Sequence, residues 1–326
     1  MDTLKLEKKW ELIPIPTKGE FSTLLIDSTC NPDLNIGLSS SKNRCLILSL
    51  PLNLNLNFFG QEKENINIIY RKDSKENAII IELTNHYLYS YFNDTIISLF
   101  YKIKDIKDVK DSSEAFIIAV NEWCSFFANV KNDKLDLNTI QGIFGELSVL
   151  NELVYKADST SINYVLNSWR GLYDDNNDFY FDEKNIEIKT KRNSKTIISI
   201  SSEFQLESEN NKKIELLVVS IESVMVNGLT IESIVEKIKN KALLLNGDVS
   251  ILYKALKQKN LTFLTFKDYN EYQFNLVSHV SYDANKNEFP KLISSEINSS
   301  LSKITYNINL ERLNDFILYN QSQFNL

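Results

Sequence analysis

Cysteine and histidine are scarce in this sequence. The three cysteines (Cys30, Cys45 and Cys124) are far apart, which excludes a disulfide framework and a cysteine-based zinc site. His86 and His279 each stand alone, so we expect both to be packing or surface residues rather than catalysts or metal ligands. No glycine-rich loop is followed by Gly-Lys-Ser or Gly-Lys-Thr, which excludes an ATPase motor in this chain.

Long apolar runs and an excess of positive charge are also missing. No run reaches the roughly 18 apolar residues that a membrane helix needs, and the N-terminal segment MDTLKLEKKWELIPI lacks the apolar stretch of a signal peptide. We therefore expect a cytoplasmic protein without a membrane partner. The net charge of −7 argues against a surface coated with basic residues for non-specific DNA binding. It leaves room for a local basic groove, and for metal ions that supply positive charge where phosphate binds.

The hydrophobic pattern divides the 326 residues into three parts. Residues 1–110 are predicted to be β-rich and to end in a helix, with a hairpin formed by Asn65–Tyr70 and Ala78–Leu83. Residues 111–245 are predicted to be an α/β core, and residues 246–326 an α/β extension packed on that core. The helices predicted around the first boundary are His86–Ile103, Ser113–Val130 with Ser112 and Ser113 as caps, and Thr139–Tyr155 with Asn138 as N-cap.

One acid-x-lysine triplet stands out from the six in the chain. The six are Glu7/Lys9, Asp73/Lys75, Asp105/Lys107, Asp108/Lys110, Asp182/Lys184 and Glu187/Lys189. Spacing alone does not distinguish them. In the last, Ile186 and Ile188 alternate with Glu187 and Lys189, so on a strand both charges share a face. The upstream segment from Asp178 alternates in the same way, and the short polar turn between predicts a hairpin that brings Asp178 close to both charges.

These residue types suit phosphodiester hydrolysis. Two carboxylates can hold Mg²⁺, a hard cation that prefers oxygen ligands and keeps several waters. The cation polarises the phosphate and acidifies a bound water. A neighbouring lysine can orient or deprotonate that water and stabilise charge in the transition state. The alternative interpretation is a solvated hairpin with a surface Glu–Lys pair.

Glu146 adds a third carboxylate. At about 100° per residue, the apolar side chains of Thr139–Tyr155 fill one broad arc, and Glu146 falls inside it. Gln141, Gly145, Ser148 and Glu152 lie on the opposite side. A carboxylate directed at a core is costly unless it is paired or binds a metal, so Glu146 is either a buried ion pair or a site residue.

Several segments resemble the PD-(D/E)XK motif proteins, a bacterial branch of the restriction-endonuclease-like superfamily. They are QGIFGELSVLNEL (141–153), Trp169-Arg170-Gly171, NDFYF (177–181), IEIKTK (186–191), ISSEFQL (200–206) and NEFPKLISSEINSSLSKITYNINL (287–310). The resemblance covers about the last 200 residues well and the segment before Ser112 only loosely. Asn177 stands where the family name implies proline.

The resemblance implies a restriction-endonuclease-like α/β fold, with a central mixed sheet flanked by helices beside the β-rich N-terminal region. It implies that Asp178 and Glu187 are metal ligands, that Lys189 is the catalytic lysine, and that Glu146 completes the metal site. Gln205 is expected near the metal or the DNA. Lys191 and Arg192 belong to the densest basic run (189–195), which is either a phosphate contact or a solvated strand end.

The function expected from this resemblance is DNA endonuclease activity that depends on Mg²⁺, with Mn²⁺ as a possible substitute, in restriction or phage defence. A homodimer is expected because cutting both strands with one site per chain favours two-fold symmetry, and partner proteins from a defence operon are expected as well. Two alternatives stay open. One is a nuclease-like DNA-binding or assembly subunit of a defence complex, and the other is an RNA nuclease.

Overall fold

A computed structural model describes residues 1–16, 21–54, 56–74, 76–127, 134–173, 175–208 and 212–325. The chain forms two compact units. The first contains Met1–Lys131 with Asp248–Tyr253 and Thr262–Leu264, and the second contains Asn132–Gly247, Lys254–Leu261 and Thr265–Leu326. Within the described ranges, no helix is long and apolar enough to cross a membrane.

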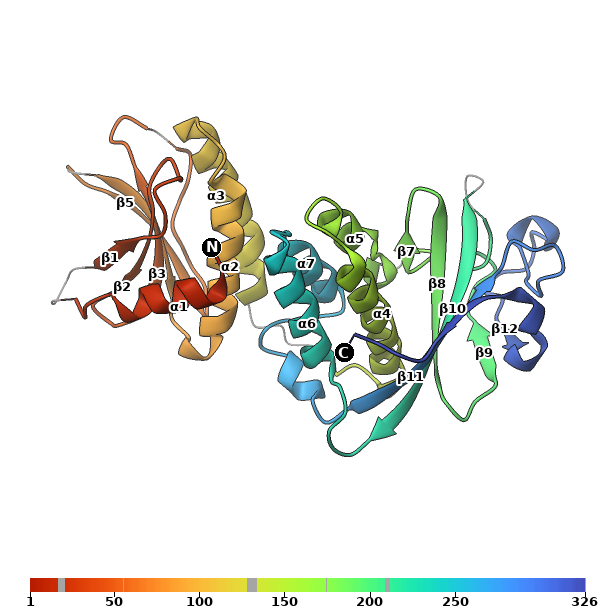
Figure 1. The fold of residues 1–326 in the computed structure, drawn as a ribbon. Coiled ribbons are helices and arrows are strands. Elements are labelled where there is room, and N and C mark those ends of the chain that lie inside the picture. Colours follow the sequence, from red (N-terminus) through yellow and green to blue (C-terminus); the bar gives the residue numbers. More distant parts are fainter. Residues whose placement is uncertain are drawn as a thin grey trace. The chain divides into compact units, whose positions relative to one another are not determined.

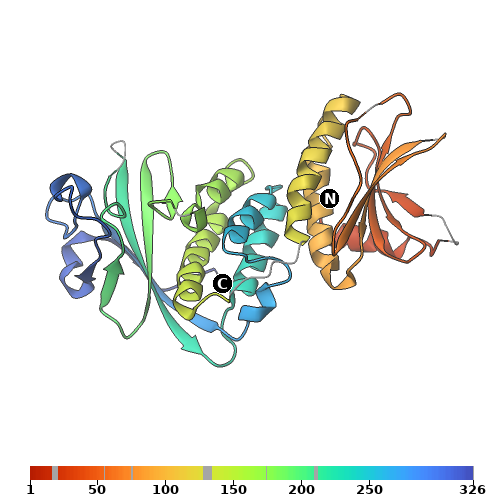
Figure 2. The same ribbon diagram turned by 180° about the vertical axis from the view of Figure 1, so that it is seen from behind.

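The first unit contains a six-stranded antiparallel sheet with the strand order β1-β2-β3-β6-β5-β4 (Figure 1). The predicted hairpin is confirmed as the β5–β6 pair, in which Ile68 lies opposite Ile81. The helices α2 and α3 lie side by side along one face of this sheet, as both Figure 1 and Figure 2 show. Its elements are α1 (Thr3–Glu11), β1 (Ser22–Leu25), β2 (Leu34–Leu38), β3 (Arg44–Leu50), β4 (Gln61–Glu62), β5 (Ile66–Lys72), β6 (Asn77–Leu83), α2 (Tyr89–Ile103) and α3 (Val109–Cys124).

Helix α3 begins earlier than the sequence predicts. Its N-cap is Asp108, whose side chain accepts hydrogen bonds from the backbone N–H groups of Lys110 and Asp111, whereas Ser112 and Ser113 are buried in the first turns. The predicted caps are therefore wrong, because the acidic side chain upstream takes that role. Residues 128–130 of the predicted helix lie outside the described residues.

The division between the units differs from the predicted boundary at 110/111. Helix α3 belongs to the first unit, where Trp123 packs against Phe126, Tyr253 and Phe263. Two short segments of the predicted extension, Asp248–Tyr253 and Thr262–Leu264, join the first unit, whereas Lys254–Leu261 and Thr265–Leu326 belong to the second unit together with most of the predicted core. Aromatic pairs between distant segments decide both differences, and a local hydrophobic pattern does not report them.

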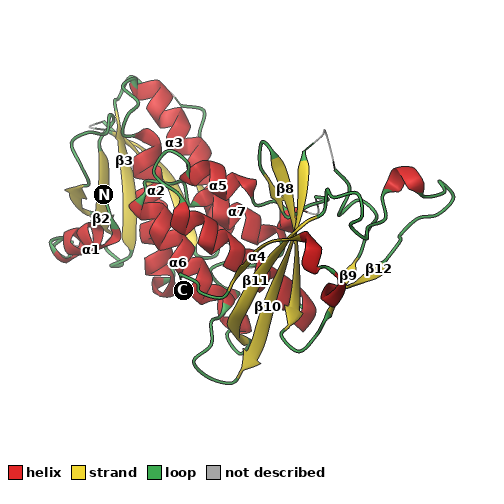
Figure 3. Cartoon of the chain, turned by 45° about the vertical axis from the view of Figure 1, so that its right-hand side comes forward, coloured by secondary structure: helices red, strands yellow, loops and turns green. Residues whose placement is uncertain are grey.

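The second unit is built on a mixed five-stranded sheet with the order β13-β11-β10-β8-β7 (Figure 3). The β8 and β10 strands are parallel, and the other pairs are antiparallel. This confirms the predicted α/β fold with a mixed central sheet. The elements are α4 (Leu137–Lys156), α5 (Ile162–Ser168), β7 (Phe179–Tyr180), β8 (Lys184–Arg192), β9 (Ile197–Ile200), β10 (Lys213–Val224), α6 (Ile231–Leu244), β11 (Gln273–Asp283), β12 (Tyr306–Asn309) and β13 (Ile317–Gln321), while α7 (Ser250–Gln258) is divided between the units.

Helix α4 packs directly on β8. A Cβ on Gly145 would lie 1.8 Å from the Oγ1 atom of Thr190, so only glycine permits this approach. Ser148 contacts the ring of His279 at 3.0 Å, and both are buried. The side of the helix opposite the apolar arc is therefore buried as well, because it faces the sheet. The N-cap is Asp136 rather than the predicted Asn138, since the Asp136 side chain accepts from the N–H of Thr139.

The other face of the sheet is covered by the two-stranded β9–β12 sheet and the loops around it. Leu216 and Val218 of β10 belong to a buried cluster with Ile198 of β9 and Ile308 of β12. The central strands are thus buried on both faces, which suits their nearly continuous apolar sequence.

Candidate active site

Glu187 and Lys189 lie together on the face of β8 that points away from α4. In the parallel register, Glu187 is beside Leu216 and Lys189 beside Val218, so these four side chains share one face. Glu187 is only 2% exposed, and its Oε1 atom lies 2.7 Å from the Lys189 amine. The Oε2 atom of Glu187 is buried and has no hydrogen-bond partner among the described residues. A solvated surface Glu–Lys pair, the alternative from the sequence, does not describe this arrangement.

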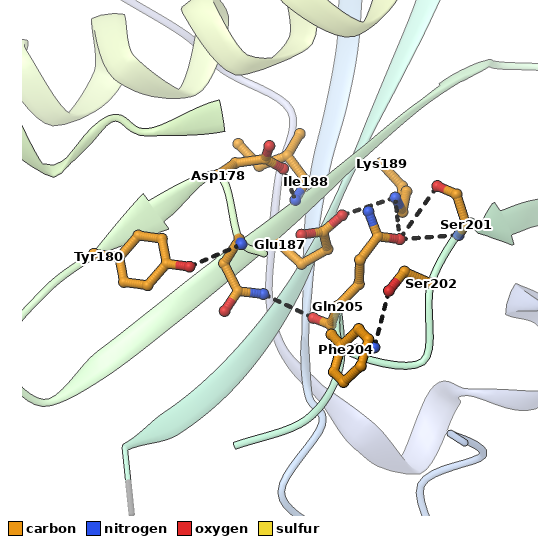
Figure 4. Close-up of polar contacts among 10 residues, drawn as sticks. Asp178, Tyr180, Glu187, Ile188, Lys189, Ser201, Ser202, Phe204 and Gln205 are labelled. Carbon is orange, nitrogen blue, oxygen red and sulfur yellow. Dashed lines mark hydrogen bonds and ion pairs between the residues drawn. The ribbon is translucent and has the colours of Figure 1, made fainter. Parts of the chain in front are cut away.

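Asp178 stands immediately before β7, at the end of the β7–β8 hairpin. The hairpin is confirmed, with Phe179 opposite Ile186. The Oδ2 atom of Asp178 accepts a hydrogen bond of 2.6 Å from the N–H of Ile188, which fixes this carboxylate at the edge of β8 (Figure 4). The backbone carbonyl of Asp178 accepts from the N–H groups of Arg170 and Gly171 at 2.7 and 3.1 Å. The Trp-Arg-Gly turn therefore holds Asp178 from the other side.

Glu146 reaches the same place from α4. Its Oε2 atom accepts a hydrogen bond of 2.8 Å from the indole N–H of Trp169. A Cβ on Gly171 would lie 2.4 Å from the Oε2 atom of Glu146 and 2.5 Å from the Oδ1 atom of Asp178. The two carboxylates thus face each other across Gly171, and Asp178 stands between the acid from the helix and the acid from β8.

Burial and mutual repulsion make it unfavourable for all three carboxyl groups to be ionised at once. Burial and the charge of Asp178 raise the pKa of Glu187 to about 8, against the smaller opposing effect of Lys189. Burial raises the pKa of Asp178 to about 6, although the Ile188 N–H opposes it. Burial and the charge of Asp178 raise the pKa of Glu146 well above its usual range. Buried carboxylates that repel one another are typical of a functional site, since positive charge from a ligand relieves the repulsion.

These residues fit a hard divalent cation by their chemistry. They supply carboxylate oxygens, including the unpartnered Oε2 atom of Glu187, and such oxygens are the ligands that Mg²⁺ prefers. In the part of the chain that the structure describes, no three histidine, cysteine or acidic side chains are already close enough to form a ligand group. Each carboxylate instead has a contact of its own: Glu187 with the Lys189 amine, Asp178 with the N–H of Ile188, and Glu146 with the indole N–H of Trp169.

Gln205 lies beside Lys189. Its Oε1 atom accepts hydrogen bonds of 2.9 Å from both the Lys189 amine and the N–H of Ser201 (Figure 4). The Lys189 amine is thus placed between one carboxylate and one amide oxygen, and its side chain is 15% exposed. Asn177 donates to the backbone carbonyl of Gln205 at 2.8 Å, which ties the start of β7 to this loop.

The remaining sequence candidates, Lys191 and Arg192, do not contact the carboxylates. Both line an open groove at the end of β8 that Lys189 also lines. The structure therefore separates the candidates into a buried cluster around Glu187 and a basic surface that begins at Lys189.

The structure gives specific roles to three further residues. Trp169 orients Glu146, Gly171 leaves the space that two carboxylates occupy, and Asn177 holds the loop of Gln205. The available signal was the Trp-Arg-Gly segment a few residues before the acidic strand. Its roles depend on partners distant in the sequence, so the segment alone could not reveal them.

Gly171→Ala tests the space between the carboxylates. We expect a large loss of activity, on the order of 100-fold, because the added methyl group displaces the Glu146 and Asp178 oxygens that lie within 2.5 Å. Circular dichroism and DNA cleavage measure the two consequences separately. Gly142→Ala is the matched control, since a Cβ at Gly142 meets nothing within 4 Å. Unchanged cleavage by Gly171→Ala would show that the two carboxylates do not act together.

The fold and the site together define a class. The mixed sheet carries Asp178 immediately before β7 and the Glu187/Lys189 pair on β8, and Glu146 of α4 lies beside them. This arrangement defines a nuclease-like α/β core. The chain belongs to the family described as "Putative PD-(D/E)XK family member, (DUF4420)", whose family model matches residues 6–311. This confirms the resemblance and extends it over the β-rich N-terminal region. Searches of curated proteins and of solved structures found no match.

Proposed function

We propose that this protein is a Mg²⁺-dependent DNA endonuclease that acts in restriction or another form of phage defence. The observation that carries the nuclease part is the group of three carboxylates around Asp178, with raised pKa values, beside the amine of Lys189. The choice of DNA and the defence role rest on the family resemblance.

Each residue of the group has a distinct role in this proposal. Asp178, Glu187 and Glu146 would hold the cation, and the bound cation would supply Lewis-acid polarisation of the scissile phosphate and of the attacking water. Lys189 donates hydrogen bonds through its amine to the attacking water or to a phosphate oxygen, and Gln205 keeps the amine in place. Trp169 orients Glu146 through its indole N–H. Burial of the Glu187 side chain keeps bulk water away from the charges, which strengthens their interactions.

The first experiment tests the activity itself. Purified protein is incubated with plasmid DNA and with RNA, in Mg²⁺, in Mn²⁺ and in chelator. We expect cleavage of DNA that requires the metal, and light scattering coupled to chromatography shows whether the active form is a homodimer. Cleavage of RNA alone would replace DNA by RNA as the substrate. No cleavage of either, alone or with partner proteins from the same operon, would favour the DNA-binding or assembly subunit.

Asp178→Asn tests metal binding. The amide keeps the size of the side chain but weakens one oxygen ligand, so we expect the loss of the thermal stabilisation by Mg²⁺ and a decrease in cleavage of more than about 100-fold. Thermal unfolding with and without Mg²⁺ measures the first effect. The matched control is Asp182→Asn, because Asp182 is exposed and belongs to the neighbouring Asp-x-Lys triplet. Equal stabilisation of wild type and Asp178→Asn by Mg²⁺ would remove Asp178 from the metal site.

A further inference from the structure

A groove of about 720 Å³ leads away from the carboxylate group along the end of β8. We call it the basic groove, and it is lined by, among others, Gln141, Lys189, Lys191, Arg192, Lys195 and Asn307. Its walls come from the start of α4, from the β8–β9 turn and from β12, all within the second unit. Since Lys189 belongs both to the groove and to the carboxylate group, the groove begins at the reacting centre.

The charge of the basic groove differs from that of the chain. The whole sequence has 43 acidic residues and 36 basic ones. Lys189, Lys191, Arg192 and Lys195 line the groove, and none of the residues described as lining it is acidic. The other polar lining residues carry hydroxyl or amide groups, which can donate hydrogen bonds. A ligand rich in acceptors and negative charge fits such a surface, and a phosphate backbone is one.

The residues that line the basic groove also favour double-stranded over single-stranded nucleic acid. Proteins that hold single strands in a basic groove stack the bases on aromatic side chains. No aromatic side chain is found among the residues described as lining the basic groove. A paired strand presents its backbone to the protein and keeps its bases stacked inside, so it needs no such platform.

We infer that the basic groove binds the sugar–phosphate backbone of double-stranded DNA on one side of the bond that is cut. This inference rests on the proposed function and adds to it the form of the substrate and the direction in which the strand leaves the centre. Lys195 and Gln141 are the residues that it adds to the DNA contact. Lys191 and Arg192, which the sequence left between two interpretations, are backbone contacts.

The test is binding in chelator, where no cleavage occurs. Fluorescence anisotropy follows a short labelled DNA duplex on the full chain between about 50 and 200 mM salt. We expect Lys195→Ala to weaken binding several-fold and to reduce the slope of log K against log salt by about 0.9, the effect of one lost phosphate contact. Lys267→Ala is the control, because Lys267 is an exposed lysine of the same unit outside the groove, and it should match wild type.

A second variant tests the space of the basic groove without changing its charge. Gly142 lines the groove and has open space where a Cβ would be, so Gly142→Phe should fold and fill the groove. We expect weaker duplex binding by Gly142→Phe than by Gly142→Ala, with circular dichroism as the check on folding.

The outcomes separate this inference from the proposed function. The inference is overturned if wild type does not bind the duplex at about 50 mM salt, or if Lys195→Ala and a folded Gly142→Phe bind as wild type does. Tighter binding of single-stranded DNA or of duplex RNA than of duplex DNA overturns the assigned form of the substrate. Groove-dependent binding without any cleavage would leave the inference standing and refute the proposed function. Cleavage of DNA by the wild type, with no effect of the groove variants on binding, would refute the inference and leave the proposed function standing.

Discussion

Glu187→Gln is expected to stabilise the metal-free protein while it abolishes DNA cleavage. The carboxylate of Glu187 is 2% exposed, one of its oxygens has no partner among the described residues, and the charge of Asp178 acts on it. A neutral amide of the same size removes the cost of this charge. The expected gain is up to about 3 kcal/mol at neutral pH, or a rise in melting temperature of roughly 5 to 10 °C.

The sign of the pH dependence follows from the pKa of Glu187. Burial and Asp178 raise this pKa to about 8 from an ordinary 4.5, so the folded chain binds the proton more tightly than the unfolded chain does. The free energy of unfolding therefore falls as the pH rises from about 4.5 to about 8, and Glu187→Gln removes this part of the slope. Thermal unfolding of the metal-free protein at several pH values measures the difference.

Glu215→Gln is the matched control for this prediction. Glu215 is also a buried glutamate, on the neighbouring strand β10, but both of its carboxylate oxygens have partners, Lys184 and the hydroxyl of Ser281, whereas one oxygen of Glu187 has none among the described residues. Its replacement should lower stability, because a partner of Lys184 is lost. If Glu187→Gln destabilises the metal-free protein as Glu215→Gln does, Glu187 is a structural ion-pair residue rather than a ligand kept at a cost to stability.

Lys189→Ala is expected to reduce DNA cleavage by about 100- to 1000-fold and to leave the fold and metal binding in place. The amine lies 2.7 Å from Glu187 and 2.9 Å from Gln205, at the point where the basic groove meets the carboxylates. Removing it takes away the donor for the attacking water or the phosphate. The carboxylates that hold the cation remain, and the opposite face of β8, where Thr190 meets α4, does not change.

Three measurements separate catalysis from structure at Lys189. Cleavage is followed across a Mg²⁺ titration, calorimetry measures metal binding, and circular dichroism checks the fold. Lys189→Arg keeps the charge, but its planar group cannot replace a compact ammonium between two oxygens, so we expect only partial recovery. Lys267→Ala should cleave as wild type does. Wild-type rates for Lys189→Ala would mean that the lysine only pairs with Glu187 and that the proposed mechanism is wrong.

Much of the local structure was predictable because it depends on neighbours in the sequence. The alternation around Glu187 and the short turn before Lys184 each involve a few consecutive residues. The helix N-caps were predicted less well than the strands, because several polar residues near the start of a helix can each act as the N-cap. Asp136 and Asp108 act as caps where Asn138 and Ser112 were predicted.

The sequence by itself determined that Glu187 and Lys189 lie on one face of a strand and that a short hairpin brings Asp178 close to them. Only the tertiary structure decided that Glu187 is buried, that Asp178 lies between two other carboxylates, and that a basic groove begins at Lys189. The physical reason is that burial, charge repulsion and close approach depend on contacts between distant segments. Gly171 shows this most clearly, because its missing side chain matters only once Glu146 and Asp178 meet in front of it.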